Sequence, residues 1–317
     1  MVAFVMRRLI YETVPLLFFL SIFIFIVLRV LPGDPLRAIV GDEITTLADA
    51  DRLVLMRELG LDKPLFFQYV DWLGNLLSGD WGRSFIDRKP VSEAIGERIL
   101  VTLQVSSIAW LLSVLLAIPI GVFSALRRNT WADAAVNVLA LLGVATPNFL
   151  FGMLLILIFA VSLGLLPTNG FVSFAEDPLQ AARYLIMPVA ALATGTMASL
   201  VRQTRSAMLE VMNEDYIRTA HSKGLAPRHV IIRHALKNAL LPVVTVAGLQ
   251  VGNLLSGTVI VETMFSIPGM GRLTVSAVYG QDYAMVQILV LILAMAHVLA
   301  NLAADVLYVR LDPRIHY

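Results

Sequence analysis

Long apolar runs alternate with polar segments along the whole chain. Roughly 20 apolar residues cross the hydrocarbon layer of a membrane, and such runs fall near residues 9–31, 99–123, 134–163, 184–201, 239–261 and 284–307. The third run is too short for two spans and is interrupted at Pro147, so we predict one span that is kinked there. The pattern predicts an all-α integral membrane protein with six transmembrane helices and both termini on one side.

Composition agrees with a membrane protein and removes several classes of chemistry. Of the 317 residues 58% are hydrophobic and 15% are charged, whereas soluble domains have about 25% charged residues. The absence of cysteine excludes disulfides, cysteine-ligated metal and thiol catalysis. Arg7 and Arg8 precede the first apolar run as in a signal peptide, but no small-residue cleavage site follows, so we expect an uncleaved first span.

The distribution of basic residues predicts the orientation. With the N-terminus inside, the inner segments hold 13 Lys and Arg, whereas the two short outer loops hold only Arg183 and Arg272. Positive charge in short loops marks the cytoplasmic side. We therefore expect both termini in the cytoplasm, a first span within 1–31, an external loop over 32–98, a transmembrane core over 99–308 and a C-terminal tail over 309–317.

The external loop has helical patterns of its own. "TTLADADRLVLMRELG" opens with Thr46 and Asp49 at capping-box spacing and stops at Gly60. In "LFFQYVDWLGNLL" apolar residues recur at 66, 69, 70, 73, 76 and 77, which is one helix face. We predict an external helical cap between spans 1 and 2. With 12 acidic and 8 basic residues over 31–98, it could be a lid on the span ends or a docking surface for an external partner.

Small residues form a stripe on the fifth apolar run. Gly248, Gly252 and Ser256 share one helix face at a spacing of four, which lets another helix approach closely. We expect this stripe to pack against a sister subunit, although packing within the chain is the alternative. Glu262 lies near the end of the same run, where its side chain could reach the interface.

Polar side chains within the last two runs are candidates for a transport pathway. Gln250 and Asn253 share a second face of the fifth run with Gly257, and His297 lies within the sixth. Buried polar groups in lipid need partners, so these residues either bond between helices or line a water-filled path. The sequence leaves both interpretations open.

No residue set supports catalysis or metal binding. The four lysines precede Pro, Pro, Gly and Asn, so the chain has no phosphate-binding P-loop. HExxH and GxSxG are also absent. His221, His229 and His234 are spaced by 8 and 5, which is no metal-binding pattern. We expect no enzyme activity and no cofactor in this chain.

The polar segment 202–238 predicts a helix, a tight turn and a second helix under the membrane. Asn213 can cap the first helix, Gly224 can end it, and Pro227 can start the second, which runs towards Pro242. Ala220 and Gly224 make the middle of the segment small, which would admit close contact from another protein. The alternative is an amphipathic hairpin that rests on anionic headgroups.

This segment resembles a known motif. "RTAHSKG", with Pro242 eighteen residues after Gly224, is similar to the cytoplasmic EAA loop of ATP-binding-cassette (ABC) importer permeases. Ala220 and Gly224 match the motif, while Arg218 and Thr219 stand in place of its Glu and Ala. "LPGDP", "FSIPGMGRL", "LDPRI" and the outer loop resemble the branch that imports peptides, nickel and related solutes, and they suggest the first of its two paired permeases.

The resemblance implies a type I ABC importer permease fold in the bacterial inner membrane. The chain would form the pathway for dipeptides or oligopeptides delivered by an external solute-binding protein. Its partners would be a second homologous permease, membrane lipid and two ATPase subunits that bind ATP and magnesium. Nickel, glutathione and opines are alternative cargoes, and a self-powered carrier or channel is a more distant alternative. The resemblance assigns ATPase coupling to Asp215, Arg218, Thr219, Ala220, Lys223 and Gly224.

Overall fold

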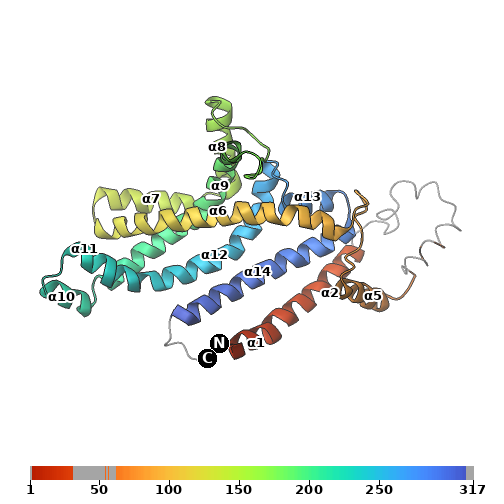
Figure 1. Cartoon of the computed structure of the whole chain (residues 1–317), viewed down its shortest axis with the longest axis horizontal. Helices are drawn as coiled ribbons and strands as arrows, with labels where there is room; N and C mark the ends of the chain where they lie inside the picture. Colours follow the sequence, from red (N-terminus) through yellow and green to blue (C-terminus); the bar gives the residue numbers. More distant parts are fainter. Residues whose placement is uncertain (1, 31–53, 55, 57–61, 312–317) are drawn as a thin grey trace.

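The computed structural model describes residues 2–30, 54, 56 and 62–311, and those ranges form a bundle of long helices with short connections (Figure 1). The first helices are α1 (Val2–Arg8), η1 (Leu9–Thr13), α2 (Val14–Val30), α5 (Leu65–Ser78), α6 (Val91–Leu126), α7 (Trp131–Ala145), α8 (Asn148–Leu155) and η3 (Ile156–Ser162). They are followed by α9 (Pro178–Val211), α10 (Asp215–Ser222), α11 (Pro227–His229), η4 (Val230–Leu236), α12 (Lys237–Met264), α13 (Met270–Tyr279) and α14 (Tyr283–Leu311).

Among the described residues, five helical segments are long and apolar enough to cross a membrane. They are Val5–Val30, Val91–Leu126, Pro178–Val211, Pro227–Met264 and Tyr283–Val306. A sixth candidate is the pair Trp131–Ala145 and Asn148–Ser162, whose axes differ by 106°. The predicted six spans are confirmed when this pair counts as one.

The third span is broken where the sequence predicts only a kink. Thr146 has extended backbone, with φ −85° and ψ 122°, and Pro147 precedes the first residue of α8. A residue before proline is disfavoured in the helical region, and proline has no N–H to continue the ladder. The chain therefore ends α7 and starts α8 in a new direction (Figure 1).

Several spans begin well before the apolar runs that predict them. α6 starts at Val91 rather than near residue 99, and the fifth span starts at Pro227 rather than near residue 239. Backbone hydrogen bonding continues through polar residues, so hydropathy marks the apolar layer and not the helix ends. α10 and the end of α14 lie towards one end of the bundle, while α5 and α13 lie towards the other (Figure 1).

Small residues bring α9 into the centre of the bundle. α9 packs against α6, α7 and α12. A Cβ added to Gly121 of α6 would lie 2.6 Å from the Thr204 Cβ of α9, and one on Gly143 of α7 would lie 2.9 Å from the Ala198 Cβ. The helices approach so closely because no side chain separates their backbones at these points.

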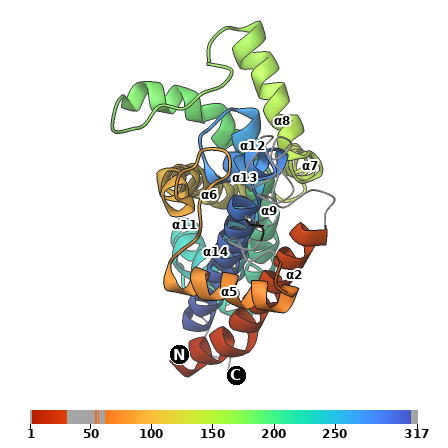
Figure 2. The same cartoon turned by 90° about the vertical axis from the view of Figure 1, so that its right-hand side faces the viewer.

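The second helix predicted for the external loop is confirmed as α5, and it lies against the C-terminal half of the first span (Figure 2). The Tyr69 hydroxyl is 2.8 Å from the Ser21 hydroxyl, and the Phe25 ring packs against Tyr69 and Trp72. α5 therefore rests on a span of its own chain. The predicted helix from Thr46 to Gly60 lies outside the described residues, apart from two positions.

The apolar face predicted for α5 is only partly the packed one. Trp72, which lies outside the predicted set, packs inwards, whereas Phe66 is 69% exposed and Leu77 is 80% exposed. A helix with apolar side chains on its outer face beside a span suits the membrane interface.

Candidate functional site: the helical hairpin and its supports

The polar hairpin predicted from the sequence is present. α10 is followed by a tight turn at Lys223–Ala226, and α11 starts with Pro227 at its first position. Gly224 has a φ of +76°, in the left-handed region that favours glycine at helix ends. The second helix runs towards Pro242 and past it, because Pro227–Met264 is one continuous helical segment.

The cap of α10 differs from the prediction. Glu214, not Asn213, is the N-cap residue, and its carbonyl accepts from the backbone N–H of Ile217 at 3.1 Å and of Arg218 at 3.3 Å. The Asn213 amide instead donates to the Leu209 carbonyl at 2.9 Å, back towards the end of α9. Asn213 therefore holds the end of the preceding helix and does not start the next one.

α10 has one buried face and one exposed face. Ile217 is 1% exposed and Ala220 is 6% exposed, and both join a core cluster with Val230 and Ala235 of η4. The interpretation of Ala220 as a contact point for a partner is therefore revised, because its methyl group packs within the chain. Its small size lets α10 approach η4.

The other predicted coupling residues share the exposed face. They are Asp215, Arg218, Thr219, Lys223 and Gly224. Arg218 pairs with Asp215 at 3.2 Å, and the Thr219 hydroxyl donates to the Asp215 carbonyl at 3.0 Å. The structure brings these residues together on one accessible surface that carries charges of both signs.

The hairpin is tied to the bundle by polar contacts. The Asn238 amide donates to the Tyr216 hydroxyl at 2.9 Å, which links α10 to the start of α12.

Arg205, near the end of α9, donates to both carboxylate oxygens of Asp133 in α7, at 2.7 and 2.8 Å. Ser124 of α6 donates to the same carboxylate at 2.6 Å. Three helices, α6, α7 and α9, therefore meet at one buried carboxylate, and α9 is the one that leads to the hairpin.

The sequence pattern does not single out the group around Asp133. Its sequence signal is local: Thr130 is the N-cap of α7 and accepts from the Asp133 N–H at 3.4 Å. Nothing in the sequence places Arg205, 72 residues away, beside that carboxylate. This pairing depends on the packing of α7 against α9.

Glu262, at the other end of the fifth span, is fully buried and does not reach the interface as predicted. Its carboxyl group accepts from the Thr102 hydroxyl at 2.7 Å, from Gly271 N–H at 2.7 Å and from Arg272 N–H at 3.1 Å. Met270 N–H donates to the Thr102 hydroxyl at 2.8 Å. The first three N–H groups of α13 are thus satisfied by side chains of α6 and α12.

The stripe of small residues packs within the chain. A Cβ on Gly248 would lie 2.7 Å from the Ala304 Cβ of α14, and one on Gly252 would lie 2.7 Å from Nδ1 of His297. The Ser256 hydroxyl donates to the Gly252 carbonyl at 3.4 Å. The predicted contact of this stripe with a sister subunit is therefore corrected, because α14 occupies the glycine face. His297 is half-buried against Gly252.

The polar face of the fifth span stays accessible. The Asn253 amide, which is exposed, donates to the Gln250 side-chain oxygen at 3.1 Å. A Cβ on Gly257, further along this face, would lie 3.6 Å from Nδ2 of Asn148, the first residue of α8. The break between α7 and α8 therefore brings a third amide towards this face, which the sequence alone did not reveal.

No cluster of three or more potential metal ligands occurs within the part of the chain that the structure describes. His229 and His234 come together, with ring centroids 6.0 Å apart, but His221 does not join them in such a cluster.

Comparison with known proteins shows which protein family this chain matches. Residues 117–317 match the family model described as binding-protein-dependent transport system inner membrane component, and residues 1–106 match the model for the N-terminal part of such components. A putative peptide transport system permease protein of Brucella suis biovar 1 is 41% identical, and the oligopeptide transport system permease protein AppB of Bacillus subtilis is 39% identical. The glutathione transport system permease protein GsiC of Salmonella choleraesuis is 40% identical. Each alignment covers 100% of both chains.

The fold has a solved counterpart. A chain of the MetNI methionine ABC transporter, solved in inward-facing conformations, matches with a TM-score of 0.57 at 18% identity, over 70% of this chain and 98% of that chain. This likeness shows the fold of a type I ABC importer permease. Together with the family matches and the full-length relatives, it establishes that the chain belongs to the family of inner-membrane components of binding-protein-dependent transport systems, as a multi-pass ABC permease subunit.

Proposed function

We propose that this chain forms one half of the pathway of an ATP-driven importer for dipeptides or oligopeptides. The observation that carries the cargo assignment is the end-to-end similarity to peptide permeases of two unrelated bacteria, at 41% and 39% identity. Glutathione is the second candidate cargo, supported by the 40% identity to GsiC. An external solute-binding protein would deliver the cargo.

The exposed face of α10 is the proposed docking surface for an ATPase subunit. Its five coupling candidates are accessible, and Ile217 and Ala220 fix the opposite face to η4. A movement of the ATPase against α10 would then pass to α9 and α12, the spans that flank the hairpin. ATP and magnesium would be bound by the ATPase subunits, because this chain carries no P-loop lysine motif.

The proposed orientation places α10 and both termini in the cytoplasm of a bacterial cell, and α5 and α13 outside its inner membrane. Two observations support it. Basic residues are concentrated in the segments that would be inside. α10 also lies towards the same end of the bundle as the end of α14 (Figure 1).

A sister permease is the proposed partner of the arm formed by α8 and η3. This arm projects from the bundle in both views (Figures 1 and 2). Its apolar side chains are exposed along its length, including Phe149, Met153, Leu157 and Val161. A second permease packed beside the bundle would cover these side chains, and it would also face the Gln250–Asn253 pair. We propose that this amide pair lines the pathway between the two subunits.

Reconstituted transport tests the function. The chain is expected to drive uptake of a labelled dipeptide into proteoliposomes only with its sister permease, its ATPase subunits, its binding protein and ATP. Uptake by this chain alone would instead indicate a self-powered carrier or channel. Nickel, glutathione and an opine serve as competing cargoes, and a preference for one of them would reassign the substrate.

Removal of the exposed charges on α10 tests the coupling surface. Asp215→Ala with Arg218→Ala is expected to lower the amount of ATPase subunit that co-purifies with the permease and to lower cargo-stimulated ATP hydrolysis with it. The matched control is Lys63→Ala with Asp71→Ala, which removes another exposed ion pair. Lys63 Nζ lies 2.6 Å from Asp71 Oδ2; Lys63 precedes α5 and Asp71 lies in it. Equal recovery of the ATPase with both variants would reject the coupling assignment.

A further inference from the structure

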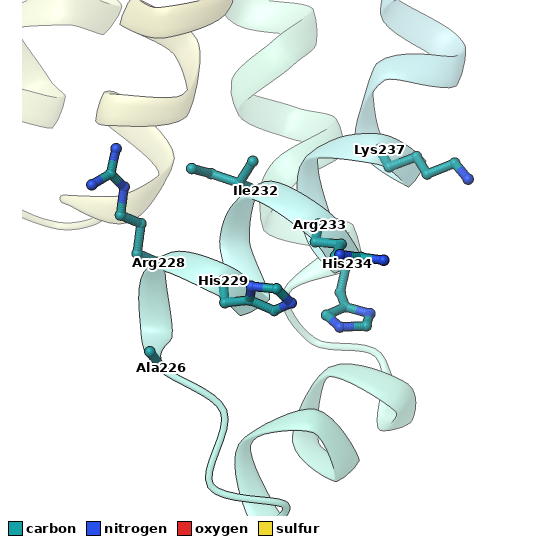
Figure 3. A pocket seen from close by; sticks show the side chains of 7 residues that line it. All are labelled: Ala226, Arg228, His229, Ile232, Arg233, His234 and Lys237. Carbon is teal, nitrogen blue, oxygen red and sulfur yellow. The ribbon is translucent and has the colours of Figure 1, made fainter.

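A groove lies on the second arm of the hairpin, where that arm continues into the fifth span (Figure 3). It has a volume of about 820 Å³ and is lined by Ala226, Arg228, His229, Ile232, Arg233, His234 and Lys237. None of the coupling candidates on α10 lines it. The groove is therefore a surface distinct from the one proposed to bind the ATPase.

The groove is basic and its charges are unpaired. Arg228, Arg233 and Lys237 are exposed, and none of them forms an ion pair with any residue that the structure describes. No acidic side chain is among its lining residues. Three fixed positive charges without a counterion inside the protein favour an anionic ligand from outside it.

The local backbone helps to gather these side chains. Val230–Leu236 is a π-helix, whose hydrogen bonds close between residues five apart rather than four. His229 and His234 have this spacing, and their rings lie 6.0 Å apart. Arg228 with Arg233, and Ile232 with Lys237, have the same spacing. The wider turn therefore brings the His229 and His234 rings together on one side of the helix.

The groove is at the depth of lipid headgroups. Pro227–Met264 has 38 residues, so at 1.5 Å per residue it is about 57 Å long, compared with about 40–45 Å for a bilayer with its headgroups. Glu262, near the C-terminal end of this segment, caps α13, which lies at the end of the bundle away from α10 (Figure 1). That end of the segment is held by α13, so we place the surplus length at the Pro227 end. Lys237 and Arg233 then lie where the apolar layer ends, and their long side chains can reach phosphates.

Two apolar side chains mark the same boundary. Ile232 lines the groove between the charges and is 53% exposed. Trp131, which starts α7 at the same end of the bundle, is 84% exposed (Figure 1). Exposed tryptophan is typical of the membrane–water interface. A ligand of this groove is therefore expected to have an apolar part beside its negative charge.

We propose that this groove binds an anionic phospholipid of the inner leaflet. Arg228, Arg233 and Lys237 would contact its phosphate and headgroup, while Ile232 would lie against an acyl chain. The choice of leaflet rests on the proposed orientation of the permease. An ATPase surface suits the groove less well, because the exposed face of α10 carries both signs of charge and the groove carries one sign beside an exposed isoleucine.

Native mass spectrometry of the intact transporter, titrated with phosphatidylglycerol or phosphatidylcholine, tests the proposal. The wild type is expected to retain phosphatidylglycerol preferentially. The groove variant Arg228→Gln with Arg233→Gln and Lys237→Gln should lose about tenfold or more of that preference and keep its ATPase subunits. Inorganic phosphate at millimolar concentration should not displace the lipid, whereas displacement would indicate a site for free phosphate.

Two controls separate this site from general basic charge. Arg127→Gln with Arg128→Gln removes exposed charges at the end of α6, outside the groove, and should leave the lipid preference unchanged. Asp215→Ala with Arg218→Ala should lower ATPase binding and spare the lipid preference, so the two proposals can fail separately. If the groove variant loses its ATPase subunits and keeps its lipid, the groove is a protein-docking surface and the proposal is wrong.

A measurement on the wild type covers the case in which the groove variant does not fold. A photoreactive phosphatidylglycerol in vesicles is expected to cross-link within residues 226–237. Cross-links found only elsewhere would overturn the assignment, whatever the behaviour of the variants.

Discussion

The hydroxyl of Thr102 on α6 donates a 2.7 Å hydrogen bond to the carboxyl group of Glu262 on α12, 160 residues further along the chain. Both side chains also satisfy the first N–H groups of α13. A negative group at a helix N-terminus is favoured by the helix dipole. This contact therefore joins two spans and the short helix α13 at a single buried point.

Replacing Glu262 should destabilise the end of the bundle at which α13 lies (Figure 1). Glu262→Ala leaves the Gly271 and Arg272 N–H groups and the Thr102 hydroxyl without their acceptor, at a cost of about 1–3 kcal/mol for each buried donor. The apparent melting temperature of the purified permease is expected to fall by several degrees. Thr263→Ala, at the exposed neighbouring position, is the control and should change stability by about 0.5 kcal/mol or less. Equal melting of both variants would contradict the role of Glu262.

Gly271 should not tolerate a side chain. A Cβ there would collide with the backbone of Val259, which cannot move aside as a side chain could. Gly271→Ala is therefore expected to lower the melting temperature. Gly96→Ala is the matched control: that glycine is inside α6 with no atom within 4 Å of the added Cβ, and alanine favours helix by about 0.5–1 kcal/mol. A neutral Gly271→Ala would show that α13 can shift away from α12.

The Asp133–Arg205 pair should contribute to both stability and coupling. Asp133→Ala leaves Arg205 without its partner and Ser124 without its acceptor, which we expect to cost about 2–4 kcal/mol. Arg205→Gln alone should also destabilise, and the double variant should lose less than the sum of the two single losses. Thermal unfolding of all three variants, with cargo-stimulated ATP hydrolysis beside it, provides the measurement. Strictly additive losses would mean that the pair is not coupled.

Gly252 should be needed for close packing of α12 against α14. Gly252→Ala would place a methyl group 2.7 Å from Nδ1 of His297, so we expect a loss of about 1–3 kcal/mol. His297→Ala in the same chain should restore part of that loss by making space. Gly257→Ala, whose nearest neighbours would be 3.4 Å away, should be close to neutral. Failure of the second substitution to rescue the first would place the strain elsewhere.

The hydropathy pattern and the turn residues determined much of this fold. Apolar runs of membrane length dictate helices, because backbone groups in lipid must bond within their own segment. Gly224 and Pro227 determined where α10 ends and α11 begins, since one residue favours positive φ and the other fits the first helical position. These are local effects, which depend on residues next to one another in the chain.

Tertiary structure alone decided which faces of the helices are occupied. The stripe at Gly248 and Gly252 could pack against any helix with a matching surface. Only the packed bundle shows that α14 is the helix that lies against it. Ala220 likewise has the size of a contact residue, yet its burial against η4 turns it inwards. Glu262 at a span end could have reached water, but the closeness of Thr102 and α13 buries it. A helical pattern gives the angle of a side chain around its own axis, and the neighbour at that angle depends on how distant segments pack.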